Sequence, residues 1–171
     1  MYQALATFLP TRTIGGTETV VLDGERLMLM HIAPAHTSAD LAVYLPAQKI
    51  VFAGDVLVNT TSYPLIHAGG SSLGWISFMK DILALDAETY VPGHGPIETK
   101  PMLQARLRKA ELRREQVKAM VEQNKSLAEV KQALPETALD PRFPTYTQVV
   151  YEELTKGYPP SLAPWAGLGG K

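Results

Sequence analysis

The chain has 171 residues, 46% apolar and 19% charged, a composition that fits a folded globular protein and excludes a disordered one. Its formal net charge of −1 gives no general attraction to nucleic acid or an anionic membrane, and no apolar run is long enough to span a bilayer. Without cysteine there are no disulfides, thiolate nucleophiles or cysteine zinc sites, so any metal ion must be held by histidine and carboxylate.

The first elements are predicted to be strands. Residues 18–32 predict a β-hairpin, because Asp23-Gly24 supplies the positive φ angles of a tight turn. A second pair, residues 41–45 and 49–53, follows. Both of these strands are almost wholly apolar, so we expect them to be buried on both faces.

Strands and helices then alternate. Residues 56–70 predict a loop, and an apolar stripe predicts a helix over 73–85 with Ser71 or Ser72 as its N-cap. A short strand is expected at 89–91, followed by a long amphipathic helix from about Pro101 to Gln123.

The remainder is predicted to be mainly helical. Two capping boxes, at 126–129 and 145–148, should each begin a short helix, and the tail from Gly157 should be irregular. The basic residues of the long helix are interspersed with glutamates, which indicates a solvated face rather than a nucleic-acid surface. The fold class is α/β. Residues 1–98 are expected to form one part and 99–171 a helical extension packed on it.

Three polar motifs each lie beside a predicted strand. His36 stands in Pro-Ala-His-Thr-Ser-Ala-Asp, Asp55 follows Phe-Ala-Gly, and His94 lies between two glycines in Val-Pro-Gly-His-Gly-Pro. Taken singly, each has an ordinary reading as a loop, turn or capping residue. Together, two histidines and an aspartate at strand ends could converge at one rim of a sheet. That donor set suits zinc, iron or manganese.

This pattern of His-Thr-x-x-Asp, then a buried strand ending in Gly-Asp, then Pro-Gly-His-Gly resembles the C-terminal half of the metallo-β-lactamase superfamily, from about Leu9 to Pro96. The resemblance implies half of an αββα sandwich and usually two zinc ions, sometimes iron. By the same resemblance, His36 would belong to the first metal site, Asp55 would bridge both ions in the catalytic centre, and His94 would complete the second site.

The family's first motif, His-x-His-x-Asp-His, is not found before His36; the only other histidine there is His31, five residues earlier in a different context. The chain is therefore expected to supply three of the metal ligands and to be a fragment or a half-fold. It would work as a homo-oligomer or with a complementing N-terminal half. Residues 1–10 do not resemble a signal peptide, which leaves the cytoplasm and the periplasm as alternatives.

Three further residues are candidates for the site. Asp40 is a candidate acceptor that orients a metal-bound histidine, with a turn cap as the alternative. His67 and Tyr63 are candidates for substrate contact; Trp75 is expected in the core.

The leading hypothesis is metal-assisted hydrolysis of a small molecule at a lactam, lactone, thioester or phosphoester bond. The alternatives are an inert half-fold or assembly module that retains the motifs, and a redox or oxygenase member that binds iron.

Overall fold

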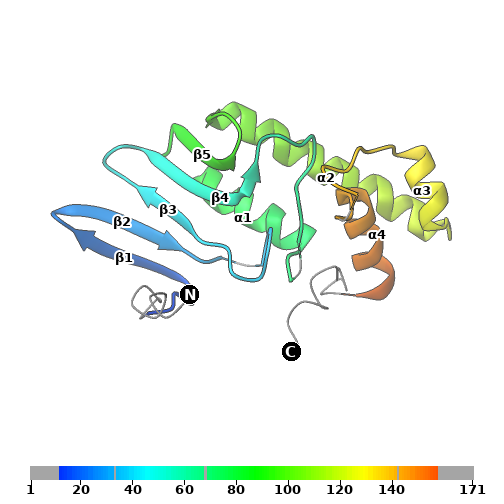
Figure 1. The fold of residues 1–171 in the computed structure, drawn as a ribbon, viewed down its shortest axis with the longest axis horizontal. Helices are drawn as coiled ribbons and strands as arrows, with labels where there is room; N and C mark the ends of the chain where they lie inside the picture. The colour runs from blue at the N-terminus through cyan, green and yellow to red at the C-terminus, as the bar shows by residue number, and fades with distance from the viewer. Residues whose placement is uncertain (1–11, 33, 68, 142, 158–171) are drawn as a thin grey trace, which may run out of the picture.

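The computed structural model describes residues 12–157 apart from 33, 68 and 142. These residues form one six-stranded sheet and four helices (Figure 1). In chain order the elements are β1 (Thr17–Leu22), β2 (Glu25–Met30), β3 (Ala42–Leu45), β4 (Ile50–Val58), α1 (Ser72–Ala84), β5 (Thr89–His94), β6 (Glu98–Thr99), α2 (Lys100–Glu122), α3 (Leu127–Ala133) and α4 (Tyr146–Lys156).

The strands lie in the sheet in their sequence order, β1 to β6. The pairs from β1 to β4 are antiparallel, β4 and β5 are parallel, and β6 returns antiparallel to β5. A parallel pair needs a crossover connection, and α1 lies in the connection from β4 to β5. The β1–β2 hairpin lies at one end of the molecule and α3 and α4 at the other (Figure 1).

The expected hairpin is confirmed, with Asp23 at φ 49° and Gly24 at φ 84° in its turn. Two boundaries differ from the expectation. β4 continues to Val58 and β5 to His94, because Val58 pairs with His94 beyond the irregularity that follows Gly54. Asp55 and His94 therefore lie within paired strands, and the expected loop at 56–70 begins only after Val58.

The two faces of the sheet differ in burial. Tyr44, Val51 and Tyr90 form a buried row that belongs to the same core cluster as Trp75 and Phe78 of α1. Trp75 is 2% exposed and donates its Nε1–H to the Val56 carbonyl, so its expected core position is confirmed.

The opposite face carries a second apolar row, in which Leu29, Val43, Phe52 and Val91 are cross-strand neighbours. Phe52 is 43% exposed, and Val43 is only half-buried. The expectation that β3 and β4 are buried on both faces was therefore wrong for the described residues, because α1 packs on one face alone.

The helical extension packs onto the rest of the fold through the same core, which includes Leu103 and Val117 of α2 and Val149 of α4, all 0% exposed. A buried polar contact adds to this packing. Glu153 of α4 accepts hydrogen bonds from the backbone N–H and the hydroxyl of Ser72 at the start of α1, and pairs with Arg114 of α2 at 2.7 Å. One hydrophobic core therefore runs through residues on both sides of position 98.

Of the two expected capping boxes, the one at Ser126 and Glu129 is complete. The second is half-formed: Thr145 caps the Gln148 N–H, but the Gln148 side chain donates to Glu152 instead of returning to Thr145. The irregular tail expected after Gly157 lies outside the described residues, as do residues 1–10. No described helix combines the length and the apolar character needed to cross a membrane.

Candidate metal centre

A cavity of about 280 Å³ brings together the three donors named from the sequence, His36, Asp55 and His94. His67 also lines it. The rest of its wall is mostly apolar and comes from Val58, Thr60, Leu65, Leu139 and Phe143. The donors come from the β2–β3 loop, from β4 and from the end of β5, as expected for residues that converge at one rim of the sheet.

His36 is held with one ring nitrogen available. Its side chain lies 5% exposed, with Nδ1 2.6 Å from the Leu65 carbonyl oxygen. A carbonyl oxygen can only accept, so Nδ1 carries a proton, and in the neutral imidazole the lone pair is then on Nε2. Histidines that bind metals through one nitrogen commonly donate the other N–H to a carbonyl or carboxylate in this way.

Asp55 and His94 face each other across the parallel pair β4–β5, with 3.4 Å between Asp55 Oδ1 and His94 Nε2. A β-carbon at Gly93 would lie 2.0 Å from Asp55 Oδ1, so only glycine leaves room for this carboxylate. The backbone at His94 is fixed by a hydrogen bond, because the Asn59 N–H donates to the His94 carbonyl at 2.7 Å.

His67 lies against His36 on one side and Phe143 on the other, each with ring centroids 4.4 Å apart. Burial, followed by the neighbouring His36 ring, lowers the pKa of His67 to about 4, against an opposing effect of Asp55. The ring is therefore neutral at pH 7. Its Nε2 is buried and has no hydrogen-bond partner among the described residues. Such an unpaired buried nitrogen is uncommon in a folded protein.

The Asp40 carboxylate does not orient the His36 ring. Oδ2 accepts from the backbone N–H groups of Ala35 and Thr37, and Oδ1 accepts from the Thr37 hydroxyl. Asp40 therefore fixes the loop that carries His36, in the manner of the turn-cap alternative. The group that accepts a hydrogen bond from the His36 ring is the Leu65 carbonyl rather than the Asp40 carboxylate, and sequence reasoning missed it.

Tyr63 lies outside this cavity and lines a neighbouring one, where its ring stacks on Tyr146. Sequence reasoning also missed the roles of Leu139 and Phe143 at the metal cavity and of Lys109 and Arg113 beside Tyr63. Nothing in the local sequence marks these residues, because they come from the extension and reach the site only through tertiary packing.

The donor atoms are of the types that bind zinc, and one distance between them fits a zinc site. Two ligands of one tetrahedral zinc ion lie about 3.3 Å apart when each bond is about 2.0–2.1 Å long. The Asp55–His94 contact of 3.4 Å matches that spacing. Among the described residues, however, no three His, Asp or Glu side chains are grouped closely enough to hold a metal ion as they stand.

Comparison with known proteins agrees with the motif pattern. The family model of the metallo-beta-lactamase superfamily matches residues 5–94, which contain His36, Asp55 and His94. The 2,4-dinitroanisole O-demethylase subunit alpha of Nocardioides sp. (strain JS1661) is 29% identical over 85 residues, which are 49% of this chain and 26% of that protein.

Two solved structures share the fold. A metallo-beta-lactamase from Pontibacter korlensis aligns with a TM-score of 0.53 at 24% identity, covering 63% of this chain and 54% of that one. The sec-alkylsulfatase Pisa1 from Pseudomonas sp. aligns with a TM-score of 0.66 at 12% identity, covering 95% of this chain and 29% of that one.

This chain thus spans about a quarter of the matched curated relative and about half or less of these two structures. The second alignment extends through the helical extension as well as the sheet. The α/β fold expected from the sequence is therefore confirmed, and the chain belongs to the metallo-β-lactamase superfamily.

Proposed function

We propose that His36, Asp55 and His94 are this chain's share of a zinc site that serves hydrolysis of a small molecule. The observation that carries the proposal is their placement on one cavity, with His36 Nε2 left free by the bond from Nδ1 to Leu65. The contact between Asp55 and His94 at ligand–ligand spacing supports the same reading.

Zinc bound there would supply a Lewis acid that lowers the pKa of water and polarises the bond to be cleaved, in a lactam, lactone, thioester or phosphoester. The chain's own residues have separate tasks. His36, Asp55 and His94 would hold zinc, and the family resemblance gives Asp55 a share in both ions of a two-zinc site. His67, which lines the same cavity and is neutral at pH 7, would contact the substrate through its ring.

The donors among the described residues do not complete a site by themselves, and we propose that the remaining ligands come from another polypeptide. The curated relative is named a subunit, which favours a second chain as their source. An inert half-fold that retains the motifs is the competing function. An iron-binding redox member is a further alternative.

The proposal is tested by calorimetric titration of the full chain with zinc, carried out before and after dialysis of the protein to remove weakly bound metal ions. We expect roughly micromolar or weaker binding. It should weaken further as the pH is lowered, because only neutral imidazole is a ligand.

Variants identify the ligands in the same titration. His36→Ala and His94→Ala should each reduce zinc affinity at least tenfold, roughly 1.4 kcal/mol or more. The matched control is His31→Ala, since His31 Nδ1 contacts the Asp40 carbonyl and does not line the cavity. Equal affinity in all three variants, or no zinc binding by the parent chain, would favour the inert half-fold. Retention of iron in preference to zinc would favour the redox alternative.

The uncovered apolar face of the sheet is a second observation in favour of a partner chain. Monomeric proteins rarely expose an apolar patch larger than a few hundred Å². The row formed by Leu29, Val43, Phe52 and Val91 has no helix over it among the described residues.

In the absence of a complementing half, we propose that a second copy covers this face, so that the isolated chain is a dimer. Light scattering at micromolar concentration should report the dimer. Phe52→Glu should convert it to a monomer without loss of helical circular dichroism, because Phe52 is already 43% exposed. A parent chain that is monomeric throughout would refute the proposal.

A further inference from the structure

A second and larger cavity, of about 550 Å³, lies beside the candidate metal centre. Residues 60–63 after β4, two side chains of α2 and residues 135–139 before α4 line it. Thr60 and Leu139 line both cavities, so the two are neighbours. A substrate with its reacting bond at His36 and His94 could therefore reach into the second cavity with another of its groups.

Two cations flank Tyr63 in this second cavity. Lys109 Nζ lies 4.5 Å from the centre of the Tyr63 ring, and the Arg113 guanidinium lies 4.3 Å from it. Both come from α2 and are four residues apart, which places them on one helix face. Among the described residues that line the cavity, Glu136 is the only carboxylate, so their positive charge exceeds their negative charge.

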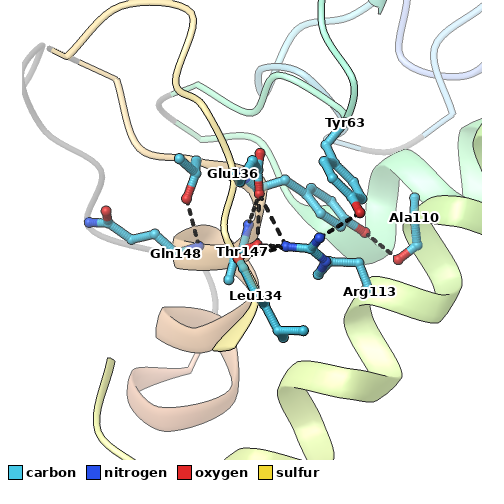
Figure 2. A network of polar contacts seen from close by, with 9 residues as sticks. Tyr63, Ala110, Arg113, Leu134, Glu136, Thr147 and Gln148 are labelled. Carbon is cyan, nitrogen blue, oxygen red and sulfur yellow. Dashed lines mark hydrogen bonds and ion pairs between the residues drawn. The ribbon is translucent and has the colours of Figure 1, made fainter. Parts of the chain in front are cut away.

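The Arg113 and Glu136 side chains are already engaged within the protein (Figure 2). Arg113 donates to the Leu134 carbonyl, to the Thr147 hydroxyl and, at 2.6 Å, to the Tyr63 hydroxyl oxygen. Glu136 accepts from the backbone N–H groups of Tyr146 and Thr147 at the start of α4 and from the Thr147 hydroxyl. These hydrogen bonds stabilise the Glu136 carboxylate, and the Arg113 guanidinium, 3.9 Å away, balances its charge.

Lys109 and the hydroxyl hydrogen of Tyr63, by contrast, lack such partners among the described residues. Within the described part of the chain, Lys109 has no carboxylate partner, and its ammonium lies over the Tyr63 ring. The Tyr63 oxygen accepts from Arg113, which strengthens the hydroxyl as a donor, yet its hydrogen has no acceptor among the same residues. An ammonium and a polarised hydroxyl therefore remain as donors on one wall of the cavity.

We propose that this cavity binds an anionic oxygen group of the substrate, a carboxylate or a sulfate. Lys109 supplies the charge, and Tyr63 supplies a hydrogen bond. Charge-assisted hydrogen bonds to such groups are stronger than neutral ones. The assignment of the bound molecule as substrate rests on the proposed hydrolase function, whereas anion binding itself does not. The substrate would then carry an anionic group on one side of the cleaved bond and an apolar part against Leu139 and Phe143.

The experiment uses the full chain after its metal ions have been removed with EDTA and the EDTA has been removed by desalting, so that no metal ion can bind the probe and no chelator carboxylate can occupy the cavity. The ¹⁵N-labelled protein is titrated with sodium benzoate, inorganic sulfate and neutral benzamide, and amide resonances are followed by NMR. We expect benzoate or sulfate to shift the resonances of residues 60–63 with saturation, and benzamide to leave them unchanged.

Lys109→Gln should weaken anion binding by roughly three- to fivefold, as expected for one ion pair at a solvent-accessible site. Lys109→Arg should retain binding because it retains the charge, and Tyr63→Phe should weaken it. The matched control is Lys118→Gln on the same helix, whose ammonium is 4.0 Å from Glu122 and lies away from the cavity.

The proposal is overturned if neither anion shifts these resonances, or if Lys109→Gln binds as tightly as the parent chain. Because no metal ion takes part, a failure of the zinc titration leaves this result intact. Conversely, absence of anion binding in this titration would not count against the proposed metal site.

Discussion

Removing the Glu153 carboxylate should destabilise the protein more than any change to a surface ion pair. Glu153 is 4% exposed and Arg114 12% exposed, and their contact at 2.7 Å joins α4 to α2 beside the N-terminus of α1. In Glu153→Gln one carboxylate oxygen becomes an NH₂ group, which faces either the Ser72 N–H or the Arg114 guanidinium. Either arrangement sets donor against donor and leaves Arg114 as a buried charge without a counter-ion.

Removal of one partner from a buried ion pair costs about 3–5 kcal/mol. For a chain of this size, that loss corresponds to a fall in Tm of roughly 6–20 °C. Urea and thermal denaturation followed by circular dichroism measure both quantities. The control is Glu122→Gln, whose pair with Lys118 is exposed and should contribute less than about 1 kcal/mol.

The double variant Glu153→Gln with Arg114→Met should recover much of the lost stability, because it removes the unpaired charge as well. A single variant that loses less than about 1 kcal/mol, or a double variant that loses the sum of both single changes, would refute this account of the contact.

Three other substitutions or titrations test separate parts of the fold. The Glu129 carboxylate should titrate at a pKa of about 2 in an NMR pH series, chiefly because it accepts the Ser126 N–H. Its pKa in the folded protein lies below the ordinary glutamate value of 4.5, so its contribution to stability is present above pH 4.5 and is lost as the pH falls through about 2. A midpoint near 4.5 would contradict the capping box. Gly74→Ala should destabilise by at least about 2 kcal/mol, although alanine normally favours a helix, because the new β-carbon would lie 1.7 Å from the Pro34 carbonyl oxygen. Gly16→Ala, with nothing within 4 Å, should stay within about 0.5 kcal/mol in the same denaturation assay, and equal effects at the two positions would count against the packing described. Asp40→Ala should cost about 2 kcal/mol in urea denaturation, because it leaves the buried Ala35 N–H and the partly buried Thr37 N–H without their acceptor; an unchanged midpoint would show that water replaces the carboxylate.

The elements that could be predicted from the sequence are those with local physical causes. Asp23-Gly24 defines its hairpin because few other dipeptides tolerate two positive φ angles in succession. Ser126 and Glu129 define the start of α3 because both halves of the capping box lie within four residues. The motif residues His36, Asp55 and His94 could be placed on one cavity because each lies beside a strand of the same sheet.

Other features depend on contacts between distant segments and leave no local pattern. Leu65, not Asp40, accepts from the His36 ring, across 29 residues of sequence. A backbone carbonyl in that role can be supplied by any residue type, so composition cannot reveal it. The exposed face of β3 and β4 was also missed, because an apolar strand that awaits a partner has the same sequence pattern as one already covered.

The helical extension forms part of the candidate metal centre as well as part of the core. Phe143 packs on His67, and Leu139 lines both cavities, so the segment between α3 and α4 forms a wall of the candidate metal centre. That segment is held in place by Glu136, whose carboxylate bonds to the start of α4, and by Arg113 of α2, which donates to the Leu134 carbonyl. The position of the wall relative to His36 and His94 is therefore set by polar contacts with the extension. Changes at Arg113 or Glu136 should alter the shape of the substrate site while leaving the three proposed metal donors in place.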